Sequence, residues 1–233
     1  ASGGAALPGV VGGYAPLSSG LLVPVGYLGS GTADATKFLR GDGTWAVPAA
    51  GGGGLVLLAQ LTAAASATID FTTRNAAGQS GALIQSDYDD YLFKIIGVVP
   101  GTNAVDFYVR VSVGGAWDTA ANYVSNHYLQ ATTGNVAVVG TWGEIRTRNN
   151  GEIQNGAAYG LSGHLELFNP QSTTLGKRFG GNIRWSGGPP NWINNIMDAY
   201  YTPSGSIIDG VRFLFSVGNI ASGIFRAYGI AKT

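Results

Sequence analysis

Two stretches of the chain combine aromatic, amide and charged side chains in a way that suits carbohydrate binding: Trp142–Asn150 (WGEIRTRNN) and Pro189–Tyr201 (PPNWINNIMDAYY). An aromatic ring packs against the C–H surface of a sugar, while amide and guanidinium groups bond its hydroxyls. The second stretch is the better candidate, since a tryptophan flanked by amides after Pro-Pro has the composition of an exposed tip. Burial in a core or a subunit interface is the competing interpretation for each ring. The candidate binding residues are Asn191, Trp192, Asn194 and Asn195, together with Trp142, Arg146 and Arg148.

Metal-binding patterns are weak. The histidines, His127 and His164, show no HxH or HExxH spacing, so we expect them to be polar side chains on strand faces. The densest acidic cluster is Asp87-Tyr88-Asp89-Asp90, and it lacks the later glutamate of an EF-hand loop. A solvated loop is the preferred interpretation of this cluster, and calcium binding is the alternative. We expect no metal site and no cofactor.

Catalytic patterns are equally weak. The glutamates are Glu144, Glu152 and Glu166, and no spacing pairs two carboxylates for glycoside hydrolysis. The sequence has no GxSxG nucleophile elbow, no GxxxxGK phosphate loop and no long repeat typical of a polysaccharide-cleaving β-helix. We therefore expect that the protein is not an enzyme.

The composition limits the kind of protein that can carry these residues. The 233 residues include 38 glycines, no cysteine, and 13 basic against 13 acidic side chains. Abundant glycine with little charge is typical of turn-rich β structure or an extended fibrous segment. The zero net charge argues against a nucleic-acid partner, which requires clustered basic residues. The uncharged stretches, residues 1–33 and Ala46–Ile69, are interrupted by proline or glycine, so we expect no membrane insertion.

From Leu55 onward, short stretches of alternating polarity predict strands. In Val105–Val113, for example, five apolar residues share one face and four mostly polar residues share the other. Leu55–Leu61 is apolar throughout, and periodicity does not decide between a strand and one or two helical turns. Turn residues separate the segments, and the pattern predicts an antiparallel β-sandwich, jelly-roll-like, over residues 55–233. The other predicted strands are Ile69–Thr72, Tyr91–Val99, Tyr123–Gln130, Val136–Val139, Leu161–Phe168, a strand from Phe179 to Trp185, Trp192–Tyr201, a strand from Val211 to Val217, and Gly223–Ala231.

The first fifty residues have a different character. They are rich in Gly, Ala, Pro and Ser, with isolated apolar groups such as Leu21–Val25 and Tyr27-Leu28. Such a segment encloses no core of its own, yet it is too apolar for a solvated linker. We expect residues 1–54 to form an extended segment, ending in the spacer Gly51–Gly54, whose apolar side chains are buried between copies of the chain. The first residue, Ala1, leaves open whether the chain is part of a longer one.

Within this segment, TKFLRGDGTWAVP (Thr36 to Pro48) resembles a signature of bacteriophage tail-fibre and related receptor-binding proteins. That signature has the form GxAxxxxFLRGDGTWxxP, and here it begins at Gly31 and ends at Pro48. The stretch Ser222–Ile230 is similar to the last strands of sandwich domains in phage tail proteins. The resemblance implies a homotrimeric virion fibre, with a glycine-rich shaft wound from three chains and globular heads facing the bacterial surface.

The Arg-Gly-Asp-Gly tetrapeptide in that motif has two interpretations. It is either a ligand displayed to an adhesion receptor or a turn between two short arms, and we prefer the turn because Asp-Gly is a turn pair. Phe38-Leu39 and Thr44-Trp45 are then hairpin arms, with Phe38 and Trp45 packing around a threefold axis. The residues of this turn and trimerisation motif are Phe38, Arg40, Gly41, Asp42, Gly43 and Trp45.

Two functions fit these observations. The first is a structural fibre protein of a bacteriophage virion that attaches the particle to a host-surface glycan or protein. The alternative is a purely structural virion component, such as a capsid-decorating fibre, a collar or a tail adaptor, which binds other virion proteins only. The expected location is the virion in both cases.

Overall fold

The computed structural model describes residues 30, 37–46, 54–72, 83–84, 87–132, 134–147, 153–188 and 191–231. The chain divides into two units, residues 1–52 and 53–233. Leu55, where the sequence predicts the second domain to begin, is the first residue of a strand in the second unit. Across the described ranges, no helix has the length and apolarity needed to cross a membrane.

The first unit contains the predicted hairpin. Strands β1 (Phe38–Leu39) and β2 (Trp45–Ala46) are antiparallel, with Phe38 opposite Ala46 and Leu39 opposite Trp45. Gly43 closes the turn with a φ of +77°, a conformation that favours glycine. Adjacent strand residues point to opposite faces, so Phe38 and Trp45 lie on opposite faces of the hairpin. One face of the hairpin therefore does not carry both rings, and their packing around a threefold axis stays a prediction.

Asp42 acts inside this turn. Its Oδ1 accepts hydrogen bonds from the Thr44 hydroxyl (2.6 Å) and the Thr44 amide (3.0 Å), which hold the pKa of the Asp42 carboxyl below its usual value. The Arg40 guanidinium lies 3.5 Å from Asp42 Oδ2, and both side chains are more than half exposed, so this ion pair contributes little to stability. Together with Gly41, these residues form the turn that the sequence predicts.

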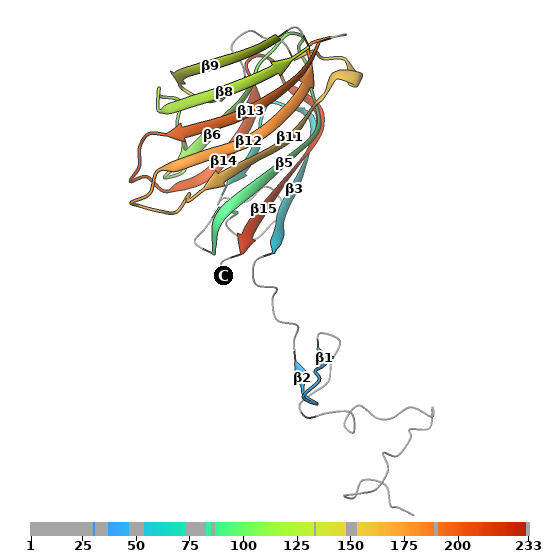
Figure 1. Cartoon of the computed structure of the whole chain (residues 1–233), viewed down its shortest axis with the longest axis vertical. Helices are drawn as coiled ribbons and strands as arrows, with labels where there is room; N and C mark the ends of the chain where they lie inside the picture. The colour runs from blue at the N-terminus through green and yellow to red at the C-terminus, as the bar shows by residue number, and fades with distance from the viewer. Residues whose placement is uncertain are drawn as a thin grey trace, which may run out of the picture. The chain divides into compact units, whose positions relative to one another are not determined.

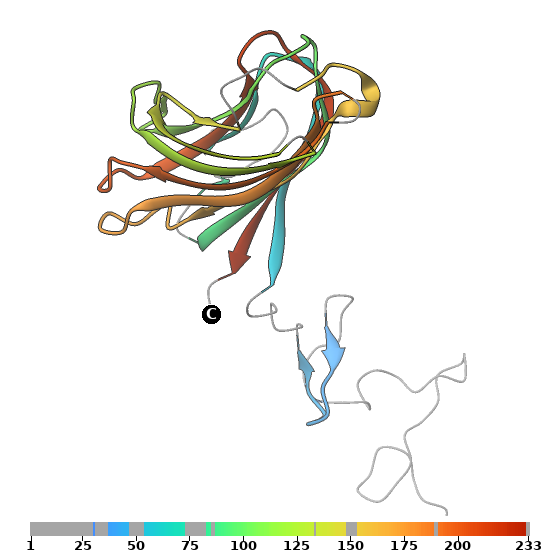
Figure 2. The ribbon, with the colours of Figure 1, turned by 45° about the horizontal axis from the view of Figure 1, so that its top comes forward.

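The second unit is built from two antiparallel sheets (Figure 1). The large sheet has eight strands, which follow one another across Figure 1 from β9 to β3. Their strong curvature along the strand direction is visible in Figure 2. The eight strands, in spatial order, are β3 (Leu55–Ser66), β15 (Ile220–Ala231), β5 (Tyr88–Pro100), β11 (Leu161–Phe168), β12 (Lys177–Ser186), β13 (Trp192–Tyr201), β8 (Tyr123–Ala131) and β9 (Gly134–Trp142).

The small sheet has five strands. Four of them run in the order β10 (Ile145–Arg146), β6 (Phe107–Val113), β14 (Ile208–Phe215) and β4 (Ile69–Thr72), and β7 (Ala116–Trp117) pairs with β6. A short 3-10 helix, η2 (Ala157–Tyr159), precedes β11. The described part of the chain is otherwise strands, turns and loops, so the all-β antiparallel class is confirmed.

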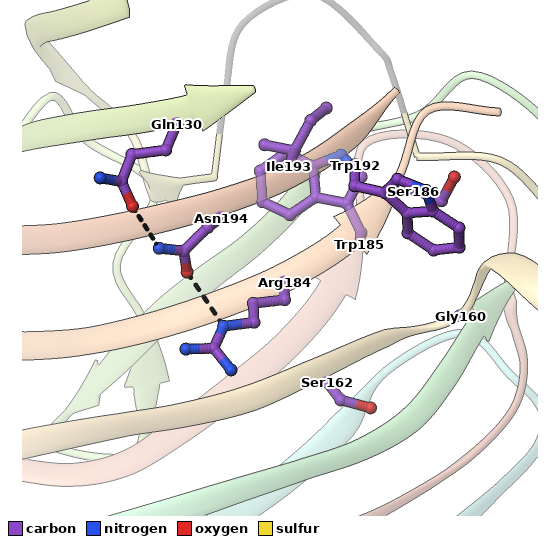
Figure 3. A pocket seen from close by; sticks show the side chains of 9 residues that line it. All are labelled: Gln130, Gly160, Ser162, Arg184, Trp185, Ser186, Trp192, Ile193 and Asn194. Atoms are coloured by element: carbon purple, nitrogen blue, oxygen red, sulfur yellow. Dashed lines mark hydrogen bonds between the residues drawn. The ribbon is translucent and has the colours of Figure 1, made fainter. Parts of the chain in front are cut away.

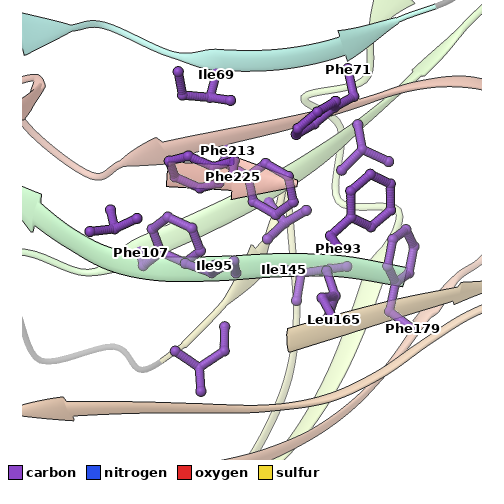
Figure 4. Close-up of a cluster of buried hydrophobic side chains, with 14 of the residues drawn as sticks. Ile69, Phe71, Phe93, Ile95, Phe107, Ile145, Leu165, Phe179, Phe213 and Phe225 are labelled. Carbon is purple, nitrogen blue, oxygen red and sulfur yellow. The ribbon is translucent and has the colours of Figure 1, made fainter. Parts of the chain in front are cut away.

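The core lies between the two sheets, where phenylalanine side chains from both meet (Figure 4). Phe71 of β4 and Phe213 of β14 contact Phe93 of β5, with ring centroids 5.5 and 5.6 Å apart. Phe213 also packs against Phe225 of β15 at 5.3 Å. Tilted and edge-on ring pairs of this kind add to the area that they bury. The core therefore joins strands that are far apart in the sequence.

Most predicted strands are present with similar ends. Three of them, Ile69–Thr72, Leu161–Phe168 and Trp192–Tyr201, agree at both ends. The ambiguous Leu55–Leu61 segment belongs to a strand, β3. Val217 is the main strand-face error, because β14 ends at Phe215 and Val217 is exposed. The consecutive neighbours β11, β12 and β13 also differ from the two paired Greek keys of a jelly roll.

One loop region is fixed by a buried lysine. The ammonium of Lys177 donates to the backbone carbonyl oxygens of Ser172, Leu175 (2.9 Å) and Ser204 (3.0 Å). The side chain is fully buried, and burial lowers its pKa. Three carbonyl acceptors match the three donors of an ammonium group, so Lys177 ties two loops to the start of β12.

Candidate functional site

A pocket of about 360 Å³ opens on the outer face of the large sheet, the face turned away from the core (Figure 3). It lies over one end of β11, β12, β13 and β8. Its walls are mainly apolar, with a few polar groups, as in many small-molecule sites. The lining residues are Gln130, Gly160, Ser162, Arg184, Trp185, Ser186, Trp192, Ile193 and Asn194.

Strand register places four polar side chains of this pocket in one cross-strand row. Ser162 is opposite Arg184, Arg184 is opposite Asn194, and Asn194 is opposite Gln130. The residues next to them along the strands are apolar and buried, including Leu161, Ile183, Ile193 and Leu129. Because successive side chains alternate between faces, the buried apolar neighbours force the polar row outward.

Asn194 is the centre of the hydrogen-bond network in this row. Its Oδ1 accepts from Asn182 Nδ2 (2.6 Å) and from Arg184 Nε (3.1 Å). Its Nδ2 donates to Gln130 Oε1 (2.6 Å). These bonds fix the orientation of the amides and of one edge of the guanidinium, so the polar groups are preorganised before any ligand arrives.

Trp192 supplies the aromatic surface. It is the first residue of β13, and its side chain is 60% exposed. The hairpin turn before it is held by the bonds Gly187 N–H to Asn191 O (2.9 Å) and Asn191 N–H to Gly188 O (2.7 Å). The Trp192 amide donates to Thr132 Oγ1 (3.1 Å). The backbone is thus anchored on both sides, while the ring stays open to solvent.

Arg184 is the charged residue that lines the pocket. No carboxylate lies within 4 Å of its guanidinium among the residues described here. Its Nε is used by Asn194, which leaves the two terminal nitrogens facing outward as donors. An unpaired guanidinium is suited to binding a carboxylate or phosphate through two parallel bonds.

Asn195 does not belong to this surface, which corrects its place among the predicted binding residues. The side chain is fully buried, and its Nδ2 donates to the Thr147 carbonyl oxygen (2.8 Å). It lies on the core face because it shares that face with Ile193. Asn191 is only half-buried, and its backbone groups close the turn that presents Trp192.

In the Trp142 stretch, the charged and aromatic side chains contact one another. Glu144 is buried and binds Arg110 Nη2 (3.0 Å) and Arg146 Nη2 (2.7 Å). The Arg146 guanidinium also lies 5.5 Å from the centre of the Trp142 ring and 5.2 Å from that of Tyr108. The groups expected to bind a ligand are therefore occupied by one another, and Arg148 lies outside the described residues.

The two predicted stretches do not form one site. Trp142 is opposite Tyr123, at the first residue of β8, whereas the amide of Trp192 bonds Thr132, just beyond the last residue of β8. The eight residue steps of β8 at about 3.3 Å each separate the two tryptophans by about 26 Å along the sheet.

The other predicted candidates are scattered. His127 is buried against the core, where burial lowers its pKa to about 4, and His164 lies on the outer face. The prediction of a solvated loop at Asp87–Asp90 is wrong, because β5 begins at Tyr88. Asp90 Oδ1 accepts a hydrogen bond from the Asn169 amide (3.0 Å). No cluster of three metal-ligating side chains occurs in the described ranges.

Sequence reasoning missed Arg184, Gln130 and Ser162. Each is a polar residue in an alternating strand, and thus predictable as outward-facing. Their meeting depends on the register between four strands, and no short motif in the sequence encodes it.

No protein-family model matches the chain, and the comparisons with curated proteins and with solved structures give no match.

Proposed function

We propose that the chain is a homotrimeric bacteriophage fibre protein whose second unit attaches the virion to a bacterial surface glycan or protein. The observation that carries the proposal is the exposed Trp192 beside a preorganised amide row and an unpaired guanidinium. Such a set offers a stacking surface, hydroxyl partners and a charged contact within one pocket. The resemblance of the FLRGDGTW motif to phage fibres supports the virion location and the trimer.

Trimerisation strengthens this proposal physically. Three copies of a weak pocket on one fibre, and several fibres on one particle, raise the overall avidity without a tight single site. No cofactor takes part in such binding.

The test is competition for adsorption. The purified chain, measured by light scattering to have three times the 23.9 kDa mass, should bind cells of the host and block phage adsorption. Trp192→Ala should lose that block, and Val139→Ala, at an exposed position on edge strand β9, should keep it. A monomer that binds no cells would refute the proposal.

A purely structural virion component is the second candidate, and β3 favours it. This strand is an edge of the large sheet, and its first residues Leu55 and Leu57 are 56% and 54% exposed. An exposed apolar edge suits contact with another protein. A connector of this kind would assemble with virion proteins, and the free chain would not reduce adsorption.

A further inference from the structure

The charges on the outer face of the large sheet are unevenly placed. Arg226 of β15 is directly opposite Lys94 of β5, which is directly opposite His164 of β11. No carboxylate lies within 4 Å of Lys94 or Arg226 among the described side chains. Like charges in directly opposed positions destabilise a sheet, so this row is arranged at a cost.

This basic row leads to the pocket. Ser162, two residues before His164 on β11, lines the pocket and is directly opposite Arg184. Neighbouring strands are about 4.8 Å apart, so Arg184 on β12 and Arg226 on β15 are about 14 Å apart across the sheet. Arg184, Lys94 and Arg226 therefore form one positively charged band that begins at the pocket and spans the width from β12 to β15.

The acidic residues Glu166 and Asp198 of the same face lie outside this band. They share one cross-strand row with Gly180 between them, and that row is two residues along the strands from the row of His164, on the side away from the pocket. Arg178 lies further still in the same direction, opposite Phe168 and Tyr200. Positive charge is thus concentrated at the pocket end of the face.

We propose that the pocket binds an anionic sugar residue, with the carboxylate or phosphate on Arg184 and the sugar ring on Trp192, and that the glycan continues over Lys94 and Arg226. This inference rests on the proposed attachment function and names the ligand class of that site. Asn194 and Gln130 supply amides for the hydroxyls of the same sugar. The bidentate geometry of a guanidinium is what distinguishes a charged sugar from a neutral one here.

The experiment is a glycan array probed with the full-length chain. Each uronate-, sialate- or phosphate-bearing oligosaccharide is printed beside its carboxyl-reduced or dephosphorylated counterpart. We expect at least tenfold stronger binding to one acidic class than to its neutral partner, and the array shows whether carboxylate or phosphate is preferred. Raising the salt concentration should weaken the acidic binding and leave the neutral binding unchanged.

Charge variants sharpen this test. Arg184→Gln should lose tenfold or more in binding to the acidic glycan, Arg184→Lys should lose less, and Lys94→Gln should lose about threefold. The matched control is Arg178→Gln, which removes the same charge from the same strand and face six residues away and should bind normally.

The outcomes separate the two proposals. If Trp192→Ala abolishes glycan binding while Arg184→Gln binds like Arg178→Gln, the anionic specificity is refuted and the attachment function stands. Equal binding to the acidic and neutral partners refutes it in the same way. If the unaltered chain binds neither bacterial cells nor any glycan, both proposals fail.

Discussion

The outer faces of the two sheets both carry arginine and tryptophan, but the contacts of these side chains differ between the two faces. On the small sheet, Arg212 binds Asp70 through two bonds of 2.8 and 2.6 Å and stacks 4.2 Å above Trp117. Beside it, Glu144 is shared by two arginines. On the large sheet, the described hydrogen bond of the Arg184 guanidinium is to the neutral Asn194 amide, and Trp192 is 60% exposed.

The difference distinguishes a surface whose charged groups are paired with one another from a surface that keeps groups available for binding. Both faces contain tryptophan and arginine, but on the small sheet Arg110, Arg146 and Arg212 are each paired with a carboxylate, and these ion pairs stabilise the fold. On the large sheet, the amides hold one another in place while the aromatic ring and the guanidinium keep unused binding capacity. We therefore expect substitutions on the small sheet to change stability and substitutions on the large sheet to change binding.

The largest expected effect concerns His127, which lies on the core side of β8, beneath the outer face of the large sheet. Burial lowers the pKa of His127 from 6.5 to about 4. The unfolded chain then holds more protons than the folded chain between these two values, so the free energy of unfolding falls as the pH drops from about 6.5 to 4. The loss is up to about 3 kcal/mol. Urea denaturation at several pH values measures it, and His127→Leu should flatten the dependence in this window. An unchanged slope in that variant would contradict the assignment.

The second effect tests the closed network of the small sheet. Glu144→Gln leaves two partly buried guanidinium groups without their carboxylate, which should reduce the free energy of unfolding by about 2–3 kcal/mol. Glu166→Gln removes the same charge from the outer face of the large sheet and should cost less than about 0.5 kcal/mol. Equal losses in the two variants would erase the distinction between the faces.

The third effect is a double comparison of the two tryptophans. Trp192→Ala should reduce binding to cells at least tenfold, because an exposed anchor ring is removed, and should leave the free energy of unfolding nearly unchanged. Trp142→Ala should leave binding unchanged and cost about 1–2 kcal/mol through lost packing and lost cation–π contact. Thermal denaturation and cell-binding assays on both variants measure these effects. A stability loss in Trp192→Ala with a binding loss in Trp142→Ala would contradict the assignment of the two tryptophans.

The smallest effect concerns the amide row. Asn194→Ala removes the bonds to Asn182, Arg184 and Gln130 and should weaken binding about fivefold, since each such bond contributes on the order of 1 kcal/mol. Asn126→Ala, an outward-facing residue of β8, is the matched control and should bind as the unaltered chain does. Similar affinities for both variants would show that preorganisation of the amides is unimportant.

The strands were largely predictable because apolar and polar residues alternate along them. Val109 and Val111 of β6 are buried and share the predicted face, and the ends of β13 agree with the turn residues around it. The same alternation predicts the position of Asn195. Once Ile193 is assigned to the core face, Asn195 must lie on that face too, and Asn194 must lie on the outer face. The error came from reading NWINN as a tip instead of as part of a strand.

The composition of the site was only partly predictable, because cross-strand partners are set by register. Trp192 and Asn194 were found from their types. Arg184 was missed because its value as a ligand depends on which residues surround it in the sheet. Arg146 was overvalued for a different reason: its partner Glu144 stands only two residues before it, and that carboxylate also binds Arg110, 34 positions away.

The burial of Lys177 and its three bonds to carbonyl oxygens should protect its side-chain amine from acylation in the folded protein. An amine-acylating reagent must reach the side-chain nitrogen, and the fully buried Lys177 offers no access while the two loops are joined. Its acylation would therefore mark molecules in which this part of the second unit has opened, and peptide mass analysis after timed labelling would record that opening.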